Sequence, residues 1–289
     1  MSRFQFVHQH RAQYALRRMC RALDVSRSGY YAWLKRPLSR RAREDGILLA
    51  AIEDAHRRSR GTYGSPRVYH ALARANIRCG RHRVARLMRQ AGLYGIPKPK
   101  RKGTTQSEAG RSVAPDLVER DFTASRPNEK WVADITYIPT QEGWLYLAVV
   151  MDLFSRRIVG WSMQQCQTED LVINALSMAV VGREAPVGLI HHSDQGGQYT
   201  STSTQALLNL HQIRASMGSK GDCYDNAAME SFVASLKREW THRRAYAARS
   251  EARLDLFWYI EAFYNRERLH STLGYLSPAE YEELHNDTP

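Results

Sequence analysis

Hydrophobic side chains recur at helical spacing through the first hundred residues. A 3.6-residue period over residues 14–23 predicts one helix, and Ser26 can cap a short aromatic helix that ends near Pro37. Further helical periods cover residues 47–55, 68–73 and 81–92, and Gly92 marks the end of the last one. These patterns predict a helix-turn-helix-like segment over residues 1–38 and a small all-α domain over residues 39–94.

The pattern changes after residue 116, where β-branched and aromatic residues gather in strand-like runs. Three consecutive strands are predicted from WVADITYIPT, WLYLAVVMDLF and RIVGWSM, with a turn at Glu142 and Gly143 between the first two. A helix over residues 169–181, a strand ending at Asp194, a helix over residues 202–211, a strand over residues 213–217 and terminal helices follow. This order predicts an α/β fold with a mixed five-stranded sheet flanked by helices.

Residues 95–115 separate these two parts of the chain. The segment GIPKPKRKGTTQSEAGRSVAP is rich in proline, glycine, lysine and serine and has no apolar period. Such a composition predicts a flexible, basic linker. The sheet and its C-terminal helices would then occupy residues 116–289.

Positive charge is concentrated in the first part of the chain. Residues 1–115 contain 26 Lys and Arg against 6 Asp and Glu, a net charge of +20, whereas residues 116–289 contain 16 against 23, a net charge of −7. A local surplus of this size indicates a polyanionic partner, and nucleic acid is the commonest polyanion in a cytoplasm. A basic solvated surface without a partner is the alternative.

The helix predicted over residues 81–92 is the candidate DNA-contacting element of this basic part. It carries Arg81, Arg83 and Arg86 around an apolar stripe. An arginine-lined helix can lie in a DNA groove or along phosphates. A solvated helix face has the same pattern, so this alternative stays open.

Composition excludes several other classes of protein. The 289 residues are 43% hydrophobic and 10% aromatic, which is enough for a globular core. The longest apolar run, residues 144–151, is far shorter than the roughly 20 residues of a membrane helix, and the N-terminus has no signal-peptide apolar region. Cys20, Cys79, Cys166 and Cys223 form no CxxC pair, so neither disulfides nor a thiolate zinc site is expected. A cytoplasmic protein is the default expectation.

Three carboxylates stand at positions that call for an explanation. Asp134 lies inside an apolar strand, where a charge is costly without a metal or a partner. Asp194 ends a strand in HHSDQGGQY, and the glycines of this loop permit close approach of a ligand. Glu230 lies on a predicted helix, DNAAMESFVASLKREW, that Asp225 or Asn226 can cap. The first and fourth strands can be neighbours in such a sheet, so the three side chains can meet at one edge.

Carboxylates that converge raise one another's pKa unless cations bind among them. Hard oxygen ligands suit Mg²⁺ or Mn²⁺, and a pair of such ions supports in-line displacement at phosphorus. Each residue also has a simpler interpretation, because aspartate often serves turns and a lone glutamate is usually solvated. The sequence leaves these alternatives open for Asp194 and Glu230.

Other polar residues near these motifs have weaker functional signals. Asp152 also ends an apolar run, and a structural pair with Arg156 or Arg157 is expected for it. His191 and His192 lack a third zinc ligand at a recognisable spacing, so a role in shaping the site or touching phosphate is favoured over zinc binding.

The motifs taken together resemble a known enzyme family. WVADITYI, HSDQGGQY and DNAAMESFVASLKRE, with 35 residues between Asp194 and Glu230, resemble the D, D-35-E signature of transposases and retroviral integrases. GWLYLAVVMDLFSRRIVGWSM, YNRERLHSTLGYLSP, VSRSGYYAW and GTYGSPRVYHAL resemble the OrfB transposase of the IS-three family of bacterial insertion sequences. The resemblance covers essentially the whole chain and implies an RNase H-like integrase catalytic core behind helix-turn-helix elements. The zinc-binding His and Cys pairs that precede the core in retroviral integrases are not matched here.

The resemblance implies roles for individual residues. The three carboxylates Asp134, Asp194 and Glu230 would be catalytic and would bind Mg²⁺ or Mn²⁺, as two ions. Lys237, seven residues after Glu230 on the same helical face, would contact DNA near its cleaved end. Residues inside the matched motifs would support the site or contact DNA, namely Asn226, Tyr199 and Gln195.

The implied activity is metal-dependent hydrolysis at insertion-sequence ends, which frees 3′ hydroxyls, followed by strand transfer of those hydroxyls without ATP. The implied partners are DNA, further copies of the chain assembled on DNA, and OrfA or an OrfA–OrfB frameshift fusion, because the chain has no leucine heptads and resembles OrfB alone. Two alternatives are a DNA-binding regulator of transposition without catalysis and a general RNase H-like nuclease. Binding without metal-dependent chemistry would indicate the first, and cleavage without strand transfer would indicate the second.

Overall fold

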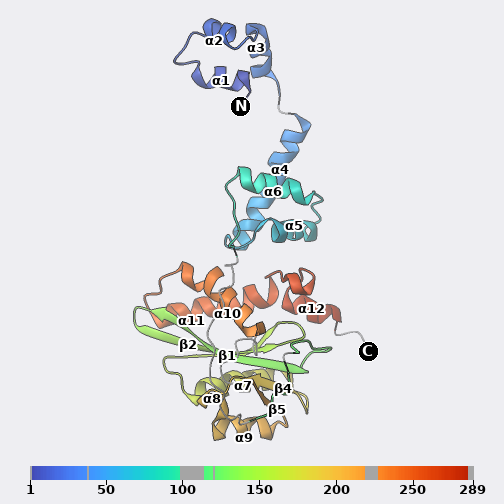
Figure 1. Ribbon diagram of the computed structural model, residues 1–289, viewed down its shortest axis with the longest axis vertical. Coiled ribbons are helices and arrows are strands. Elements are labelled where there is room, and N and C mark those ends of the chain that lie inside the picture. Colours follow the sequence, from blue (N-terminus) through green and yellow to red (C-terminus); the bar gives the residue numbers. More distant parts are fainter. Residues whose placement is uncertain (1, 38, 98–113, 120, 219–226, 286–289) are drawn as a thin grey trace.

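A computed structural model describes residues 2–37, 39–97, 114–119, 121–218 and 227–285. The protein is elongated, with the helices of residues 3–35 at one end, the helices of residues 40–90 in the middle, and the sheet with its covering helices at the other end (Figure 1). The acidic part of the sequence therefore forms one end of the molecule and the basic part forms the other.

The first three helices enclose a small core of their own. They are α1 (Arg3–His10), α2 (Leu16–Ala22) and α3 (Arg27–Lys35), around Val7, Met19, Cys20 and Tyr30. The two predicted helices are confirmed as α2 and α3, and the Ser26 hydroxyl caps α3 by accepting a hydrogen bond from the Gly29 backbone N–H at 2.9 Å. The sequence pattern does not predict α1, because Val7 is its only buried residue and one buried position makes no hydrophobic period.

The second group of helices confirms the three periods of the middle segment. It consists of α4 (Arg40–Arg58), α5 (Ser65–Arg74) and α6 (Arg81–Gln90). Their apolar stripes meet in a core that contains Leu48, Ile52, Val68, Leu72, Val84 and Leu87. Each helix buries one face only, as expected for amphipathic helices in a small domain.

Both ends of the predicted linker pack on the fold. A Cβ atom on Gly95 would lie 2.2 Å from the Gly64 backbone nitrogen, so only glycine fits there, and the Ile96 N–H donates to the Thr62 carbonyl at 3.3 Å. At the other end, the Pro115 carbonyl accepts a hydrogen bond at 3.2 Å from a strand of the sheet. Residues at both ends of the predicted linker, 95–115, therefore contact the folded parts of the chain. Residues 98–113 lie outside the described residues.

Five strands form one mixed sheet in the order β3-β2-β1-β4-β5. They are β1 (Lys130–Thr140), β2 (Gly143–Asp152), β3 (Ile158–Gln164), β4 (Ile190–Ser193) and β5 (Arg214–Met217). β1, β2 and β3 are antiparallel, whereas β4 runs parallel to β1 and β5 runs parallel to β4. The predicted mixed five-stranded sheet, with the first and fourth strands side by side, is confirmed.

Helices cover both faces of this sheet (Figure 1). One face packs on α7 (Glu169–Arg183), α8 (Gly197–Thr200) and α9 (Thr202–Leu210). The other packs on α10 (Ala227–Glu239) and α11 (Arg249–Trp258), which continues as a π-helical segment, η2 (Tyr259–Tyr264). A turn of 3₁₀-helix at Thr241–Arg243, another at Ser271–Leu273, and α12 (Pro278–His285) complete the C-terminal part. Along β1, Trp131 and Ala133 belong to the α7 side, and Val132 belongs to the α10 side.

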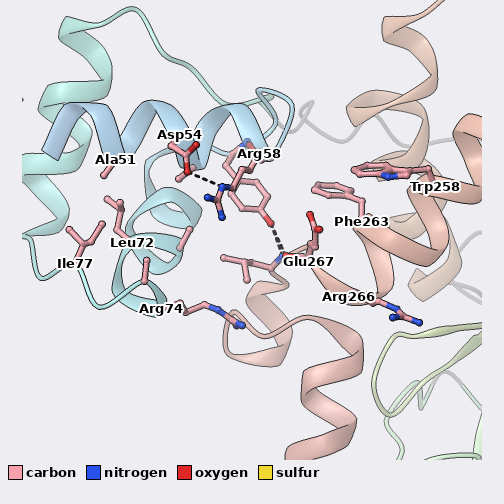
Figure 2. A pocket seen from close by; sticks show the side chains of 16 residues that line it. Ala51, Asp54, Arg58, Leu72, Arg74, Ile77, Trp258, Phe263, Arg266 and Glu267 are labelled. Atoms are coloured by element: carbon pink, nitrogen blue, oxygen red, sulfur yellow. Dashed lines mark hydrogen bonds and ion pairs between the residues drawn. The ribbon is translucent and has the colours of Figure 1, made fainter. Parts of the chain in front are cut away.

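The α4–α6 group packs against the C-terminal helices. The Arg60 guanidinium lies between the rings of Trp240 and Trp258, 4.2 Å from each centroid. The Tyr63 hydroxyl accepts a hydrogen bond from the Leu269 N–H at 2.9 Å and donates to the Glu267 carbonyl at 3.2 Å. A cavity of about 650 Å³ remains at this junction, with side chains of α4 and α5 on one wall and Trp258 among the residues of the other (Figure 2). The junction nevertheless shares one continuous hydrophobic core.

The described residues also bear on membrane-spanning helices and on the state of the cysteines. None of the helices there combines the length and the apolarity that crossing a bilayer requires. Cys20, Cys79 and Cys166 are free thiols, of which Cys20 is buried, Cys79 is half-buried and Cys166 is exposed, and Cys223 lies outside the described residues.

Candidate active site

β1 and β4 bring Asp134 and Asp194 to the same level of the sheet. The two strands are parallel, and the last paired positions are Val132 and His192. Asp134 and Asp194 each follow two residues later, at equal offsets from that pair. Side chains alternate along a strand, so Asp134 shares the face of Val132, which packs under α10. Asp134, within β1, and Asp194, directly after the end of β4, therefore lie at the same level of the sheet, with Asp134 on the face that packs on α10.

Asp134 is electrostatically coupled to the other two predicted carboxylates. It is half-buried and accepts a hydrogen bond from the Ile135 backbone N–H at 2.8 Å. Burial, together with the charges of Asp194 and Glu230, raises the pKa of Asp134 to about 6, although the Ile135 hydrogen bond and Lys237 act in the opposite direction. Asp194, Glu230 and Lys237 therefore each lie within electrostatic range of Asp134.

Glu230 lies in the first turn of α10 and is exposed. A negative charge in the first turn is favourable there because the positive end of the helix dipole is close. Lys237 lies two turns further along, and its ammonium group is 4.5 Å from the centroid of the Tyr137 ring on β1. The predicted helix caps, Asp225 and Asn226, lie outside the described residues, as does any role of Asn226 in the site.

The three side chains offer only oxygen donors, which suit hard divalent cations such as Mg²⁺. Asp194 accepts a hydrogen bond from the Gly196 N–H at 3.0 Å, and in the described part of the chain none of the three carboxylates forms an ion pair. Their oxygens are thus not consumed by arginine or lysine. Among the same residues no group of three His, Cys, Asp or Glu side chains is gathered closely enough to hold a metal ion. Like charges repel, so carboxylates do not approach to ligand distances by themselves.

The other residues predicted inside these motifs have different surroundings. Gln195 is half-buried and donates to the Gly218 carbonyl at 2.9 Å, which ties the loop after β4 to the end of β5. Tyr199 is only 3% exposed, and its hydroxyl has no hydrogen-bond partner in the described structure. Burial and the charges of Asp134 and Asp194 raise its pKa well above the usual value. Such burial is inconsistent with direct DNA contact by Tyr199, so the supporting role is the one that remains.

His191 and His192 are interior residues of the sheet. Both are buried, at 2% and 1% exposure, so neither can touch phosphate. His191 packs near Tyr199, and His192 interacts through Nδ1 with the Ser216 hydroxyl at 2.9 Å. Their adjacency in the sequence is misleading, because successive residues of a strand point to opposite faces.

The arginines of α6 are partly engaged inside the α4–α6 group. Arg83 and Arg86 each donate to the Asp45 carboxylate at 2.6 Å, which joins α6 to α4. Arg81 is exposed. Arg81 therefore stays a candidate for DNA contact, whereas Arg83 and Arg86 have a structural function that the sequence did not indicate.

Asp152 is structural, as expected, but its expected partners are wrong. The residue is fully buried and accepts backbone hydrogen bonds from Asn128 at 2.7 Å and Phe154 at 2.8 Å. The nearest cation is Arg183 of α7, at 3.6 Å. Arg157 instead binds Glu282 of α12 at 2.7 Å. Arg183, which is distant in sequence, is near Asp152 in place of the adjacent arginines, because the turn after β2 directs those arginines toward the C-terminal helices.

Sequence reasoning also missed a group of arginines beside Glu230. Arg67, Arg156 and Arg238 line a cavity of about 530 Å³ that Glu230 also borders. Arg238 directly follows Lys237 in the sequence, which is a weak indication that it lies near the site. Arg67 and Arg156 come from distant elements, so nothing in their local sequence connects them with α10.

Comparison with known proteins assigns the chain to a family. Residues 124–223 and 211–278 match two integrase core domain models, and residues 42–101 match an HTH-like domain model. The transposase InsF for insertion sequence IS3A of Escherichia coli is 42% identical over 97% of this chain and 98% of its own length. An insertion element IS600 protein of Shigella sonnei, described as an uncharacterized 31 kDa protein, is 43% identical over 93% of this chain and 98% of its own length.

A solved structure also resembles the chain. It is the intasome of simian T-cell lymphotropic virus in complex with PP2A regulatory subunit B56 gamma, with 17% identity, a TM-score of 0.46, and coverage of 76% of this chain and 71% of that one. The assignment itself rests on the relatives that share more than 40% identity over nearly the full length. The chain belongs to the IS-three family of insertion-sequence transposases, DNA-binding DDE enzymes with an RNase H-like integrase core domain.

Proposed function

We propose that Asp134, Asp194 and Glu230 are the catalytic carboxylates of this transposase. The observation that supports the proposal is the parallel register of β1 and β4, in which Asp134 and Asp194 have equal offsets from the last paired positions. The electrostatic coupling of Asp134 with Asp194 and Glu230 adds the third carboxylate. No ion pair engages these groups within the described residues, so their charge is available to a ligand.

Two divalent cations, Mg²⁺ or Mn²⁺, are the cofactor that fits these oxygen donors. When bound, such ions activate the attacking oxygen and stabilise the leaving oxygen of a phosphoryl displacement. The carboxylates of Asp134, Asp194 and Glu230 would hold them. The half-burial of Asp134 favours this role, because a partly desolvated carboxylate interacts more strongly with a cation than one fully in water does.

The reaction has two phosphoryl-transfer steps. Hydrolysis of a phosphodiester at the end of the insertion sequence frees a 3′ hydroxyl. Attack of that hydroxyl on a second phosphodiester forms the new P–O bond and releases the strand on its far side. One phosphodiester is exchanged for another, so joining needs no nucleotide triphosphate.

DNA recognition involves both halves of the molecule. The net charge of +20 in residues 1–115 supplies long-range attraction for the DNA backbone. Lys237 lies over the Tyr137 ring and within electrostatic range of Asp134, and it would contact a phosphate near the cleaved end. Gln195 and Tyr199 support the loop that follows β4, and Arg81 contributes to the basic surface of α6. Assembly of several copies on DNA, together with OrfA or as its frameshift fusion, completes the proposed complex.

The test is strand cleavage and joining by the purified full chain with Mg²⁺ or Mn²⁺, on oligonucleotides that carry the element's end. Asp194→Asn removes one carboxylate charge and should abolish both reactions while DNA affinity is retained. Asp170→Asn is the matched control, because Asp170 is an exposed aspartate in the first turn of α7. Unchanged activity of Asp194→Asn would remove the catalytic assignment.

A further inference from the structure

The cavity beside α10 is lined by arginines from four separate parts of the chain. Its volume is about 530 Å³. Arg67 comes from α5, Arg156 from the turn between β2 and β3, Arg238 from α10, and Arg268 from the segment after η2. Convergence of four like charges from distant elements is unfavourable unless anions compensate it.

The carboxylates of the fold compensate only part of this charge. Glu239 accepts two hydrogen bonds from Arg268, each of 2.9 Å, and it also lies 3.4 Å from Arg67 and 4.0 Å from Arg238. A single buried carboxylate thus faces three of the four guanidinium groups.

The remaining hydrogen-bonding capacity lies on two arginines. Within the described residues the half-buried Arg156 forms no ion pair. The Nε atom of Arg238 is buried without a hydrogen-bond partner in the same residues. A buried donor without an acceptor costs free energy, and an anion in the cavity would satisfy both groups at once.

The cavity is adjacent to the proposed catalytic edge. Ala227, Ser231, Ala234 and Arg238 recur every three or four residues along α10 and form its face toward the cavity. Glu230 borders the same cavity from about a quarter turn around the helix. A group bound here would therefore lie close to a phosphodiester held at Asp134, Asp194 and Glu230.

We propose that this cavity binds a phosphate group of the DNA, next to the phosphodiester on which the carboxylates act, with Arg156 and Arg238 as its main ligands. The inference rests on the proposed function, which brings DNA to this edge of the sheet. Guanidinium groups match phosphate oxygens with paired hydrogen bonds. The volume lies within the range of about 300 to 1,000 Å³ that is typical of small-molecule sites, so one nucleotide fits.

The experiment measures DNA binding by the full chain without divalent metal, so it does not depend on catalysis. Fluorescence anisotropy is recorded over a range of salt concentrations with a labelled duplex that carries a single-stranded 5′ extension. Arg156→Gln and Arg238→Gln should each weaken binding several-fold and lower the slope of log K against log salt by about one. Arg214→Gln is the matched control, because Arg214 is exposed at the start of β5, at the opposite end of the parallel strands, and should leave both quantities unchanged.

A second measurement separates phosphate binding from a structural role. Arg156 has no carboxylate partner among the described residues, so Arg156→Gln should melt at or above the temperature of the parent in the absence of DNA. A 5′-phosphorylated and a 5′-hydroxyl extension distinguish the sources of the phosphate. An effect confined to the phosphorylated probe assigns a terminal phosphate, and an effect on both assigns an internal phosphodiester.

Parental affinity and salt slope in both variants would overturn the cavity assignment, as would a loss of stability that accounts for the loss of binding. The proposed function would survive that result as long as Asp194→Asn is inactive. Conversely, an active Asp194→Asn with reduced salt slopes for Arg156→Gln and Arg238→Gln would leave a phosphate site beside carboxylates that are not catalytic.

Discussion

Glu230 and Glu239 lie on the same helix, α10, yet their surroundings are opposite. Glu230 is exposed, forms no ion pair within the described residues, and lies among carboxylates that raise the pKa of Asp134. Glu239 is 4% exposed and is bound by Arg268 through two hydrogen bonds of 2.9 Å. The same functional group is thus left without a cation at the start of the helix and neutralised near its end.

This contrast distinguishes functional from structural carboxylates in this fold. A buried acid whose charge is matched by arginine holds elements together and has nothing left to offer a ligand. The pairing of Glu282 with Arg157 and Arg183 repeats the Glu239 pattern between α12 and the sheet. An acid that remains beside other acids is available to a cation.

The largest expected effect is on catalysis. Glu230→Gln should lower the rate of strand transfer by about 10⁴-fold or more, as removal of a central catalytic group typically does. Its unfolding free energy should change by less than about 0.5 kcal/mol, because the side chain is an exposed surface group. Single-turnover joining assays and urea unfolding measure the two quantities. If this variant joins strands at the parental rate, Glu230 is a solvated surface residue and not a catalytic one.

The second-largest effect is expected on stability, when Glu239 loses its partner Arg268. Arg268→Gln leaves the Glu239 carboxylate buried with weaker partners and should destabilise the protein by about 3 to 5 kcal/mol in urea unfolding. The double variant Arg268→Gln/Glu239→Gln removes the uncompensated charge as well. It should be more stable than the sum of the two single variants predicts, and strict additivity would show that the pair is not coupled.

Acid should weaken the same pair. Burial alone would raise the pKa of Glu239, but Arg268 and Arg67 hold it below the usual value of 4.5. A folded-state pKa below the unfolded value gives stability that is present above pH 4.5 and is lost as the pH falls through the folded value. The unfolding free energy should decline in this acidic range, and the decline should be shallower in Glu239→Gln. Identical pH profiles would mean that Glu239 is not the group that titrates.

The smallest effect is expected for a solvent-exposed ion pair. Arg40 and Glu44 on α4 form a 2.8 Å pair, with side chains 89% and 45% exposed. Arg40→Gln should therefore cost less than about 0.5 kcal/mol, since exposed pairs contribute little. A cost comparable to that of Arg268→Gln would show that burial is not what distinguishes the two pairs. Thermal melting of both variants in one buffer makes the comparison direct.

Local sequence patterns were sufficient for most of the regular elements. The alternation in WVADITYIPT and the apolar run of WLYLAVVMDLF predicted β1 and β2, because each strand buries residues against a helical layer. The periods of α4, α5 and α6 were visible for the same reason. α1 and the π-helical segment η2 were not predictable, since one buries a single residue and the other is a local variation within a continuous helix.

The site was predictable only in part. Asp134, Asp194 and Glu230 stood out because each is a carboxylate next to an apolar run or at a conspicuous spacing. The actual partners of the other polar residues were not visible. Arg183 reaches Asp152 from α7, Asp45 binds Arg83 and Arg86 from α4, and Tyr199 is buried behind the loop that follows β4.

Short-range patterns in the chain were enough to predict the order of helices and strands, the separation of charge between the two ends of the chain, and the three candidate carboxylates. These features depend on residues close together in the chain, whose hydrophobic period and charge can be read directly. Only the tertiary structure decided which acids meet arginines and which remain beside one another. Such pairing depends on side chains from distant elements, as when Arg67, Arg238 and Arg268 surround Glu239 and leave Arg156 without a carboxylate among the described residues.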